Sequence, residues 1–365
     1  MEIDFANLSL AYKDHKEEFD QAVAGVLENA NYIMGEPVSR LEKTLEQFTG
    51  AKHAISCSSG TDALLLTMMA IDIQPGDEII TTPFTFVATA ETIAFLKAKP
   101  VFVDIDGTSF NIDVTKIEEK ITPRTKAIMP VSLFGQTADM DVINEIARKH
   151  NLYVIEDAAQ SFGATYKGKK SCNLSTFACT SFFPAKPLGC FGDGGAVFTN
   201  DDNFSEKIKS LRLHGQSERY HHKYIGMGGR LDTLHAEILN VKLKYYQNDI
   251  DNRQRVAGEY DKNLAGIVNT PKICEDYSSV WAQYSIRVNN RTQVAAKLKE
   301  AGIPTAIHYP KPLHLQECFD YLNYKNGDFS VAEKISNEIL SLPMNPYLKR
   351  EEIEFISHNL KSIIL

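Results

Sequence analysis

A single lysine, Lys186, lies inside an apolar and glycine-rich stretch, SFFPAKPLGCFGDGGAVFTN at residues 181–200. An ammonium group in such surroundings is costly unless it is paired or its pKa falls. A Schiff base with an aldehyde removes this cost, because the amine becomes an imine. The alternative is that Lys186 is a surface residue on a loop. Other residues of the chain distinguish between these two interpretations.

Asp157 ends a strand-like run in YVIEDAAQSFGA at residues 153–164. We expect it at the C-terminal edge of a parallel sheet, where α/β proteins hold ligands. An acidic residue at the end of a buried strand usually has a cationic partner, and a protonated pyridine nitrogen is one such partner. Gln160 is placed to donate to a neighbouring ring oxygen. The alternative is that Asp157 caps a loop.

Gly60 and Thr61, in SSGTDALLL at residues 58–66, stand between a predicted strand and a predicted helix. Helix N-termini offer free N–H groups and a partial positive charge, so they bind phosphate. The alternative is an ordinary N-cap made by Ser59 or Thr61. Because the stretch is neither G-x-G-x-x-G nor a Walker A motif, it disfavours a dinucleotide or P-loop site.

Two further residues complete a set. Ser181 is placed to hold a phosphate oxygen, and Phe86 is placed to stack on a flat ring, with simple core packing as its alternative. A phosphate loop, an acid for a ring nitrogen, a lysine and a stacking aromatic are what a pyridoxal 5′-phosphate (PLP) site requires.

The elements around these residues follow an alternating pattern between about residue 50 and residue 200. Strand-like runs lie at residues 53–57, 78–83, 100–106, 127–133 and 152–158, and helical patterns at 60–72, 85–97 and 140–151. Such alternation predicts a mostly parallel sheet covered by helices on both faces. Two more strands, at 176–183 and 194–200, are joined by the loop that carries Lys186.

The pattern changes after residue 200. It predicts helices at 203–215, 229–266, 291–302 and 329–344 and strands at 280–288 and 303–310. The stretch 229–266 is too long for a single compact helix without a kink. We therefore predict a large domain at residues 1–245 and a smaller α+β domain at 246–365.

The composition excludes several classes of protein. The 365 residues carry a net charge of −8 without a long basic run, so no nucleic-acid partner is expected. No apolar run approaches the roughly 20 residues of a membrane-spanning helix, and the first residues lack the apolar core of a signal peptide. Six scattered cysteines form no C-x-x-C pair, which disfavours a metal site. A cytoplasmic location, with no membrane association, is the expectation.

Over nearly its whole length the sequence resembles the fold-type I PLP enzymes, and specifically the DegT/StrS sugar aminotransferases. The stretches above carry the resemblance, together with FTFVATAETI, PVFVDID, LHGQ, GRLDTLHAEIL, HYPKPLH and SLPMNPYL. The resemblance implies an α/β fold with a mostly parallel central sheet flanked by helices in the large domain. It also implies a nucleotide-linked keto-sugar as substrate, L-glutamate as amino donor and a homodimer with shared active sites.

The resemblance also implies roles for individual residues. Lys186 matches the lysine bonded to the cofactor, Asp157 the partner of the pyridinium nitrogen and Gln160 the contact of the ring hydroxyl. Gly60, Thr61 and Ser181 match the family's phosphate contacts, and Phe86 matches the aromatic ring that stacks on the cofactor. Residues in the substrate pocket, or in the segment that reaches across the dimer, match Arg230, His308, Tyr309, His214 and Arg219.

One stretch narrows the subtype of aminotransferase. FFPAKPLGCFGDGGA, with Asp193 before the glycine pair, resembles the same stretch in family members that aminate carbon 3 of the sugar. The resemblance is closest to aminotransferases acting on UDP-2-acetamido-2-deoxy-3-oxo-glucuronate for O-antigen biosynthesis. A carboxylated sugar suits Arg230, because guanidinium binds carboxylate in a bidentate manner. The alternatives are a dTDP-3-oxo-6-deoxyhexose 3-aminotransferase and a non-catalytic PLP-binding regulatory protein.

The sequence departs from the family pattern in one segment. Relatives usually read G-x-N-x-R where this chain reads GMGGR, so Gly228 replaces an asparagine that reaches the partner subunit's cofactor phosphate. His235 and Glu237 stand where relatives commonly have glutamine and alanine. These departures put the affinity for PLP and the dimer contact in doubt, but not the chemistry at Lys186.

Overall fold

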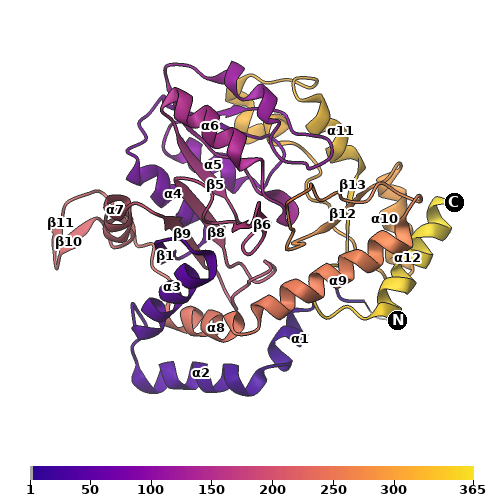
Figure 1. Cartoon of the computed structure of the whole chain (residues 1–365), viewed down its shortest axis with the longest axis horizontal. Helices are drawn as coiled ribbons and strands as arrows, with labels where there is room; N and C mark the ends of the chain where they lie inside the picture. The colour runs from indigo at the N-terminus through magenta and orange to yellow at the C-terminus, as the bar shows by residue number, and fades with distance from the viewer. Residues whose placement is uncertain (1–2) are drawn as a thin grey trace.

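A computed structural model describes residues 3–365 and shows a central sheet wrapped by helices (Figure 1). The order across the sheet is β1-β9-β8-β5-β4-β2-β3. The strands are β1 His53–Cys57, β2 Glu78–Thr81, β3 Lys99–Phe102, β4 Thr125–Ile128, β5 Tyr153–Asp157, β8 Phe177–Ser181 and β9 Gly195–Thr199. Within the described chain, β9 is the one strand of this sheet that runs against its neighbours. The predicted mostly parallel sheet is therefore confirmed.

Helices cover both faces of the sheet and so bury its strands on both sides. Residues on one face, such as Ala127 and Ile155, join a core with α4 Gly60–Ala70, α5 Ala88–Phe95 and α7 Asp202–Arg212. On the other face, Ile128 and Val154 pack against α6 Met140–His150. The same face packs on α3 Glu36–Thr49 and α8 Thr233–Leu243, which α2 Lys16–Asn29 covers in turn.

The later part of the chain builds a second apolar core. This core joins α9 Tyr246–Leu264, α10 Arg291–Glu300 and α12 Arg350–Ile364 to the antiparallel pair β12 Tyr284–Arg287 and β13 Ile339–Leu342. The C-terminus lies beside this core (Figure 1), and Ile3 is part of it. The predicted kink in 229–266 is confirmed, since α8 ends at Leu243 and α9 begins at Tyr246. We propose the domain boundary between residues 245 and 246, and this break supports it.

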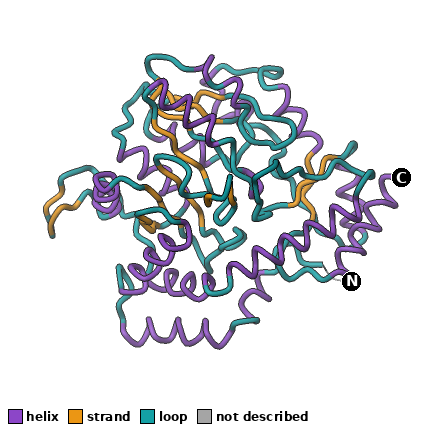
Figure 2. The backbone as a smooth tube through the Cα atoms, viewed as in Figure 1, coloured by secondary structure: helices purple, strands orange, loops and turns teal. Residues whose placement is uncertain are grey.

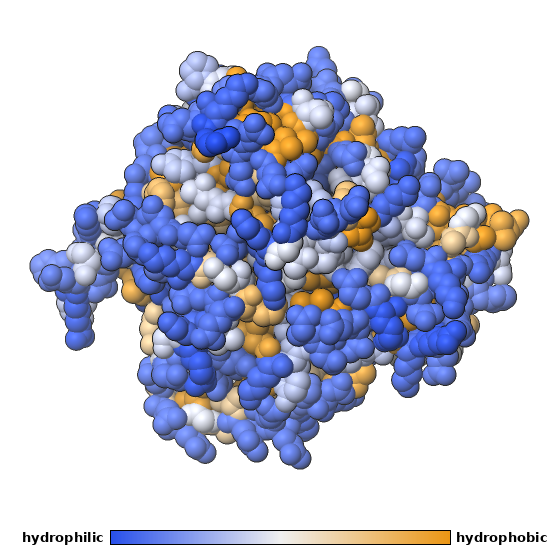
Figure 3. All heavy atoms as spheres, viewed as in Figure 1, coloured by the Kyte–Doolittle hydropathy of each residue, from blue (hydrophilic) through white to orange (hydrophobic). Residues whose placement is uncertain are grey.

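Two more helices and two pairs of short strands lie outside the two cores' main elements. The helices are α1 Leu8–Lys13 and α11 Ser330–Glu338, and the paired strands are β6 Thr165–Tyr166 with β7 Lys169–Lys170 and β10 Gln216–Glu218 with β11 His221–His222. The β10–β11 hairpin projects away from the body (Figure 2), and its outer surface is hydrophilic (Figure 3). No helix in residues 3–365 is long and apolar enough to cross a membrane.

Two predictions of local structure were wrong. Residues 303–310 do not form a strand; their only sheet-like contact in the described chain is an isolated bridge between Ala306 and Ser341. The predicted helix at 329–344 ends at Glu338, and the next four residues form β13. The apolar residues of this segment fit a helical spacing, but pairing with β12 wins because it completes the second core.

Candidate active site

Three strands of the sheet end at one edge and bring distant parts of the chain together there. Gly195, the first residue of β9, pairs with Cys57 at the end of β1 and with Ser181 at the end of β8. β5 runs parallel to β8, so Asp157 lies at the same edge. This is the carboxyl edge at which open α/β sheets bind ligands.

Asp157 is buried at the end of β5 and is held by two donors. Its Oδ2 accepts a hydrogen bond from the hydroxyl of Thr89 at 2.8 Å, and its Oδ1 accepts one from the backbone N–H of Ala159 at 3.2 Å. Burial raises the pKa of this carboxyl above its usual value, while the two donors and the charge of Lys186 oppose the rise. A cationic ligand at this position would keep the buried carboxylate charged.

Thr89, in the first turn of α5, and Thr85, which precedes the helix, form a short chain of hydroxyl groups. Because its hydrogen goes to Asp157, the oxygen of Thr89 accepts from the hydroxyl of Thr85 at 3.0 Å. Sequence analysis missed both threonines. The signal was present, since they stand four residues apart at the start of α5 beside Phe86, but threonines at the start of a helix are too common to identify a site.

Lys186 lies in the connection between β8 and β9, where its backbone N–H donates to the carbonyl of Phe183 at 2.8 Å. Its side chain is partly buried, and in residues 3–365 its amine has no hydrogen-bond or ion-pair partner. Burial lowers the pKa of the amine, and the charge of Asp157 raises it. The surface-loop interpretation is therefore wrong. The amine of Lys186 is desolvated, and it lies close enough to the Asp157 carboxylate for the two charges to interact.

The start of α4 lies against the end of β8. Ser59 caps the helix by accepting from the N–H of Asp62 at 3.0 Å, so the N-cap interpretation is confirmed for Ser59. A Cβ placed on Gly60 would lie 2.7 Å from the Cβ of Ser181, which is an overlap. Thr61 follows directly in the first turn. The glycine is needed for this close approach, and the free N–H groups of the helix point to the same edge.

Gln160 and Phe86 both contact Tyr309. The amide nitrogen of Gln160 donates to the hydroxyl of Tyr309 at 3.1 Å, and its amide oxygen accepts from the N–H of Phe134 at 2.8 Å. The ring of Phe86 is 55% exposed and its centroid lies 6.3 Å from that of Tyr309. The core-packing interpretation of Phe86 is therefore wrong. Burial raises the pKa of Tyr309, so its hydroxyl stays protonated.

His308 adds an imidazole beside the lysine. Its Nδ1 lies 2.9 Å from the hydroxyl oxygen of Ser341. Burial, and then the positive charge of Lys186, lowers the pKa of His308 to about 4. The imidazole is therefore neutral at physiological pH. The structure thus brings Lys186, Asp157, Gln160, His308 and Tyr309 together within one chain.

The remaining predicted residues lie on a separate segment. Gly228 adjoins the imidazole of His214 and the guanidinium of Arg230. Arg219 stands at the turn of the projecting β10–β11 hairpin, over the ring of Tyr220 at 5.2 Å, and this chain does not bring it to Lys186. The segment meets the residues before α4 through a hydrogen bond from the N–H of Ser58 to the carbonyl of Gly229 at 3.1 Å.

The two other departures from the family pattern have partners within the chain. The imidazole of His235 packs on Gly192, where an added Cβ would lie 2.6 Å from its Nε2. Glu237 accepts from Arg40 and, at 3.2 Å, from the amide of Asn240. Both side chains therefore stabilise the packing around α8 in the single chain.

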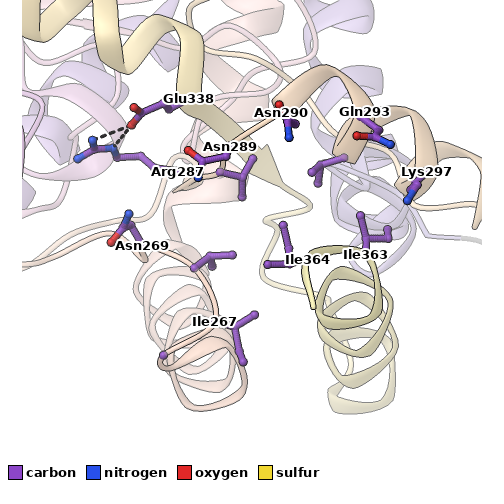
Figure 4. A pocket seen from close by; sticks show the side chains of 14 residues that line it. Ile267, Asn269, Arg287, Asn289, Asn290, Gln293, Lys297, Glu338, Ile363 and Ile364 are labelled. Atoms are coloured by element: carbon purple, nitrogen blue, oxygen red, sulfur yellow. Dashed lines mark hydrogen bonds and ion pairs between the residues drawn. The ribbon is translucent and has the colours of Figure 1, made fainter.

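A cavity of about 440 Å³ lies elsewhere, between the end of α9, α10 and α12 (Figure 4). The ion pair of Arg287 with Glu338, at 2.7 Å, lies on its wall. None of the site residues predicted from the sequence lines it, so it is separate from the cluster at Lys186. In residues 3–365 no group of three or more side chains has the composition of a metal site.

The cluster at the sheet edge fits pyridoxal 5′-phosphate. The tight approach of Gly60 to Ser181 leaves backbone N–H groups open for a phosphate. The unpartnered amine of Lys186 is free to bond to an aldehyde, and the buried Asp157 needs the positive charge that a pyridinium nitrogen supplies. The exposed ring of Phe86 offers a face for stacking.

Sequence comparison finds curated relatives along almost the full chain. UDP-2-acetamido-2-deoxy-3-oxo-D-glucuronate aminotransferase of Pseudomonas aeruginosa is 52% identical over 97% of this chain and 98% of its own. A pleiotropic regulatory protein of Geobacillus stearothermophilus is 44% identical over 98% of this chain and 97% of its own. A dTDP-3-amino-3,6-dideoxy-alpha-D-galactopyranose transaminase of Aneurinibacillus thermoaerophilus is 41% identical over 96% and 97%.

Comparison with solved structures finds the same fold in related proteins. DesV of S. venezuelae superposes with a TM-score of 0.97 at 35% identity, covering 99% of this chain and 98% of that one. NtdA of Bacillus subtilis, with bound cofactor PMP, gives 0.93 at 30% identity, covering 100% and 85%. The sequence pattern of the DegT/DnrJ/EryC1/StrS aminotransferase family matches residues 13–361. The chain is therefore a PLP-dependent enzyme that belongs to the DegT/DnrJ/EryC1/StrS aminotransferase family.

Proposed function

We propose that the protein moves the amino group of L-glutamate to the 3-keto carbon of UDP-2-acetamido-2-deoxy-3-oxo-glucuronate. The observation that carries this substrate is the 52% identity, over nearly the full chain, to the relative named for it. The cluster of Lys186, Asp157 and the Gly60–Ser181 contact supports the reaction type. The product, a 3-amino uronic acid on UDP, suits the building of O-antigen or a related surface glycan.

Lys186 is the proposed catalytic acid and base. Its Nζ, freed when the amino donor enters, would take the proton from Cα of glutamate and deliver it to the cofactor carbon that takes up the amino group. A lowered pKa favours this role, because an unprotonated amine is needed to accept a proton. The same residue then acts in reverse on the keto-sugar.

Asp157 keeps the ring nitrogen of the cofactor protonated. When bound, PLP supplies an electron sink for the pair released as the C–H bond breaks. Thr89 holds Oδ2 of Asp157 and so orients the carboxylate. Gln160 and Phe86 are the proposed contacts of the ring oxygen and ring face, and Gly60, Thr61 and Ser181 those of the phosphate.

Arg230 is the proposed receptor for the sugar carboxylate. Its guanidinium is partly buried, and within residues 3–365 it forms no hydrogen bond or ion pair. Guanidinium and carboxylate match in a bidentate geometry. His308 and Tyr309 line the same proposed pocket from the Lys186 side.

A homodimer is part of the proposal. Arg219 and the projecting hairpin lie away from the cluster of their own chain, which suits residues that complete a partner's site (Figure 1). His214 and Gly228 are assigned to the same cross-subunit surface. We also propose a cytoplasmic location, where nucleotide sugars and glutamate are available.

A dTDP-3-oxo-6-deoxyhexose remains the second candidate substrate, favoured by the 41% identity to a dTDP-sugar transaminase. The non-catalytic alternative is favoured only by the name of one relative, a pleiotropic regulatory protein. An unpartnered lysine beside a buried aspartate argues against that alternative, because a purely structural site has no need of either.

The experiment offers the purified protein PLP and L-glutamate with each of three keto-sugars. These are UDP-2-acetamido-2-deoxy-3-oxo-glucuronate, the corresponding UDP-3-oxo sugar without the carboxylate, and a dTDP-3-oxo-6-deoxyhexose. Mass spectrometry should show efficient amination of the first. Preferential amination of the dTDP sugar would establish the second candidate instead, and a lack of turnover with all three would leave only the regulatory interpretation.

A further inference from the structure

Glu156 stands beside Asp157 on β5 and is fully buried. Successive side chains of a strand point to opposite faces, so Glu156 lies on the face of the sheet away from Asp157. Its Oε1 accepts hydrogen bonds from the hydroxyls of Ser132 at 2.8 Å and Ser171 at 2.7 Å, and its Oε2 accepts from the N–H of Cys172 at 3.0 Å. These donors favour the ionised carboxylate, against the burial that raises its pKa.

The bond to Ser132 leads from Glu156 to Gln160. Ser132 directly precedes a short turn of 3₁₀ helix at Leu133–Gly135. Within that turn, the backbone N–H of Phe134 donates to the amide oxygen of Gln160 at 2.8 Å. The turn that Glu156 holds at one end therefore holds the amide of Gln160 two residues further on.

The bond to Ser171 leads to the same place from the other side. Because the hydroxyl hydrogen of Ser171 goes to Glu156, its oxygen accepts from the hydroxyl of Ser161 at 2.8 Å. Ser161 directly follows Gln160, and both serines are fully buried. A buried polar network in which the members hold one another is rigid. Glu156 thus fixes the backbone next to Gln160 as well as the turn that contacts its amide.

The orientation of the Gln160 amide depends on these contacts. Since its oxygen is held by the N–H of Phe134, its NH₂ group points the other way and donates to the hydroxyl of Tyr309 at 3.1 Å. An amide presents a donor on one side and an acceptor on the other. If the turn moved, Gln160 could present its oxygen where a donor is needed.

We propose that Glu156 is a positioning residue, which holds the amide of Gln160 with its NH₂ group toward the ring oxygen of the bound cofactor. It acts through Ser132 on the turn and through Ser171 on the backbone. The inference deepens the proposed function and rests on one part of it, the contact of Gln160 with the ring oxygen.

The test is a pH titration of the visible absorbance of the lysine-bound cofactor, with no substrate present. In that state the nitrogen joined to the cofactor shares its proton with the ring oxygen. A donor to the oxygen competes with this proton, so a weaker donor moves the midpoint of the titration to higher pH. Ser132→Ala and Ser171→Ala each remove one bond of Glu156. Each should raise the midpoint by about half a pH unit, as expected for a partly lost hydrogen bond.

A second pair of variants separates positioning from general damage. In a Gln160→Ala background, which itself should raise the midpoint, Ser132→Ala should cause no further change, because the group that it acts through is gone. Thr199→Val is the matched control. It loses an equally buried bond, to the carbonyl of Thr176 at 3.0 Å, at the end of β9 away from the site. This variant should titrate as the parent does.

Glu156→Gln keeps the shape of the side chain but sets an NH₂ group against the donors around it. If it folds, by circular dichroism, it should raise the midpoint more than either serine variant. The two serine variants test the proposal even if it does not fold, since each removes a single hydroxyl.

Two results would overturn the inference alone. One is a raised midpoint in Gln160→Ala that neither serine variant shares. The other is a shift by Ser132→Ala that is just as large in the Gln160→Ala background. A parental midpoint in Gln160→Ala would overturn both this inference and the proposed role of Gln160. Failure of the proposed substrate looks different, because the parent would not aminate the uronate sugar while all these midpoints stayed as expected.

Discussion

Thr89 on α5 donates its hydroxyl to Oδ2 of Asp157 at 2.8 Å, across 68 positions of sequence. This bond works against the rise in the Asp157 pKa that burial causes. Loss of this bond would remove a donor from a buried carboxylate. A hydrogen bond to a charged group contributes about 1.5–3 kcal/mol of stabilisation. Thr89 therefore positions the aspartate and favours its ionised form.

Thr89→Val should lower kcat about tenfold and make the loss larger at acid pH. Without the hydroxyl the pKa of Asp157 rises further, so the carboxylate is protonated at a higher pH and the acid limb of the pH–rate profile moves upward. Thr89→Ser should restore both. Asp157→Ala should be slower still while PLP stays attached to Lys186. An unchanged acid limb in Thr89→Val would contradict this role.

Lys186→Ala should have no measurable turnover and no visible absorbance from lysine-bound cofactor. The reason is that in the proposed mechanism one amine provides both the covalent attachment and the proton transfer. Borohydride treatment of the parent protein, followed by peptide mass spectrometry, should place the reduced cofactor on Lys186. Lys170→Ala, a half-buried lysine on β7, is the matched control. Turnover that survives in Lys186→Ala would refute the assignment.

Gly60→Ala should weaken PLP binding roughly tenfold or more. Its Cβ would lie 2.7 Å from the Cβ of Ser181, so the first turn of α4 must move and its N–H groups lose their aim at the phosphate. Gly258→Ala is the control, because a Cβ there meets nothing within 4 Å in α9. It should bind PLP normally and unfold at a slightly higher temperature. Normal PLP affinity in Gly60→Ala would exclude the loop from the phosphate site.

Arg230→Gln should lower kcat/KM for the uronate substrate by about tenfold to a hundredfold, because a charge-assisted pair is lost. The corresponding UDP-3-oxo sugar without the carboxylate should be aminated as before. Arg350→Gln, on the surface of α12, provides the matched arginine control. Equal losses with both sugars would show that Arg230 acts on something other than the carboxylate.

His308 should make stability depend on pH in the cofactor-free protein. Its pKa is about 4 in the folded state against 6.5 ordinarily. Between these values the unfolded chain binds a proton that the folded chain does not, so the free energy of unfolding falls as pH falls from 6.5 toward 4. Urea denaturation should show a smaller decline between pH 7 and pH 5 for His308→Gln than for the parent. His358→Gln should decline as the parent does; an identical decline in His308→Gln would contradict the lowered pKa.

The sequence predicted the parallel part of the fold well, and the site only in its outline. Buried strands such as 152–158 carry their own signal, because both faces are apolar. The segment 339–342 does not: its apolar spacing continues that of α11, and only pairing with β12 makes it a strand. In the same way the bond from Thr89 to Asp157 and the contact of Gln160 with Tyr309 depend on neighbours far away in the chain.

The reversed direction of β9 has a consequence for Lys186. A connection between two parallel strands has to travel to the opposite end of the sheet and back, whereas residues 182–194 leave β8 and return into β9 at one end. The amine is thereby tethered from both sides by a ladder of backbone bonds. Changes in this short span can alter what surrounds the amine, but both ends of the span stay fixed beside the end of β5, where Asp157 lies.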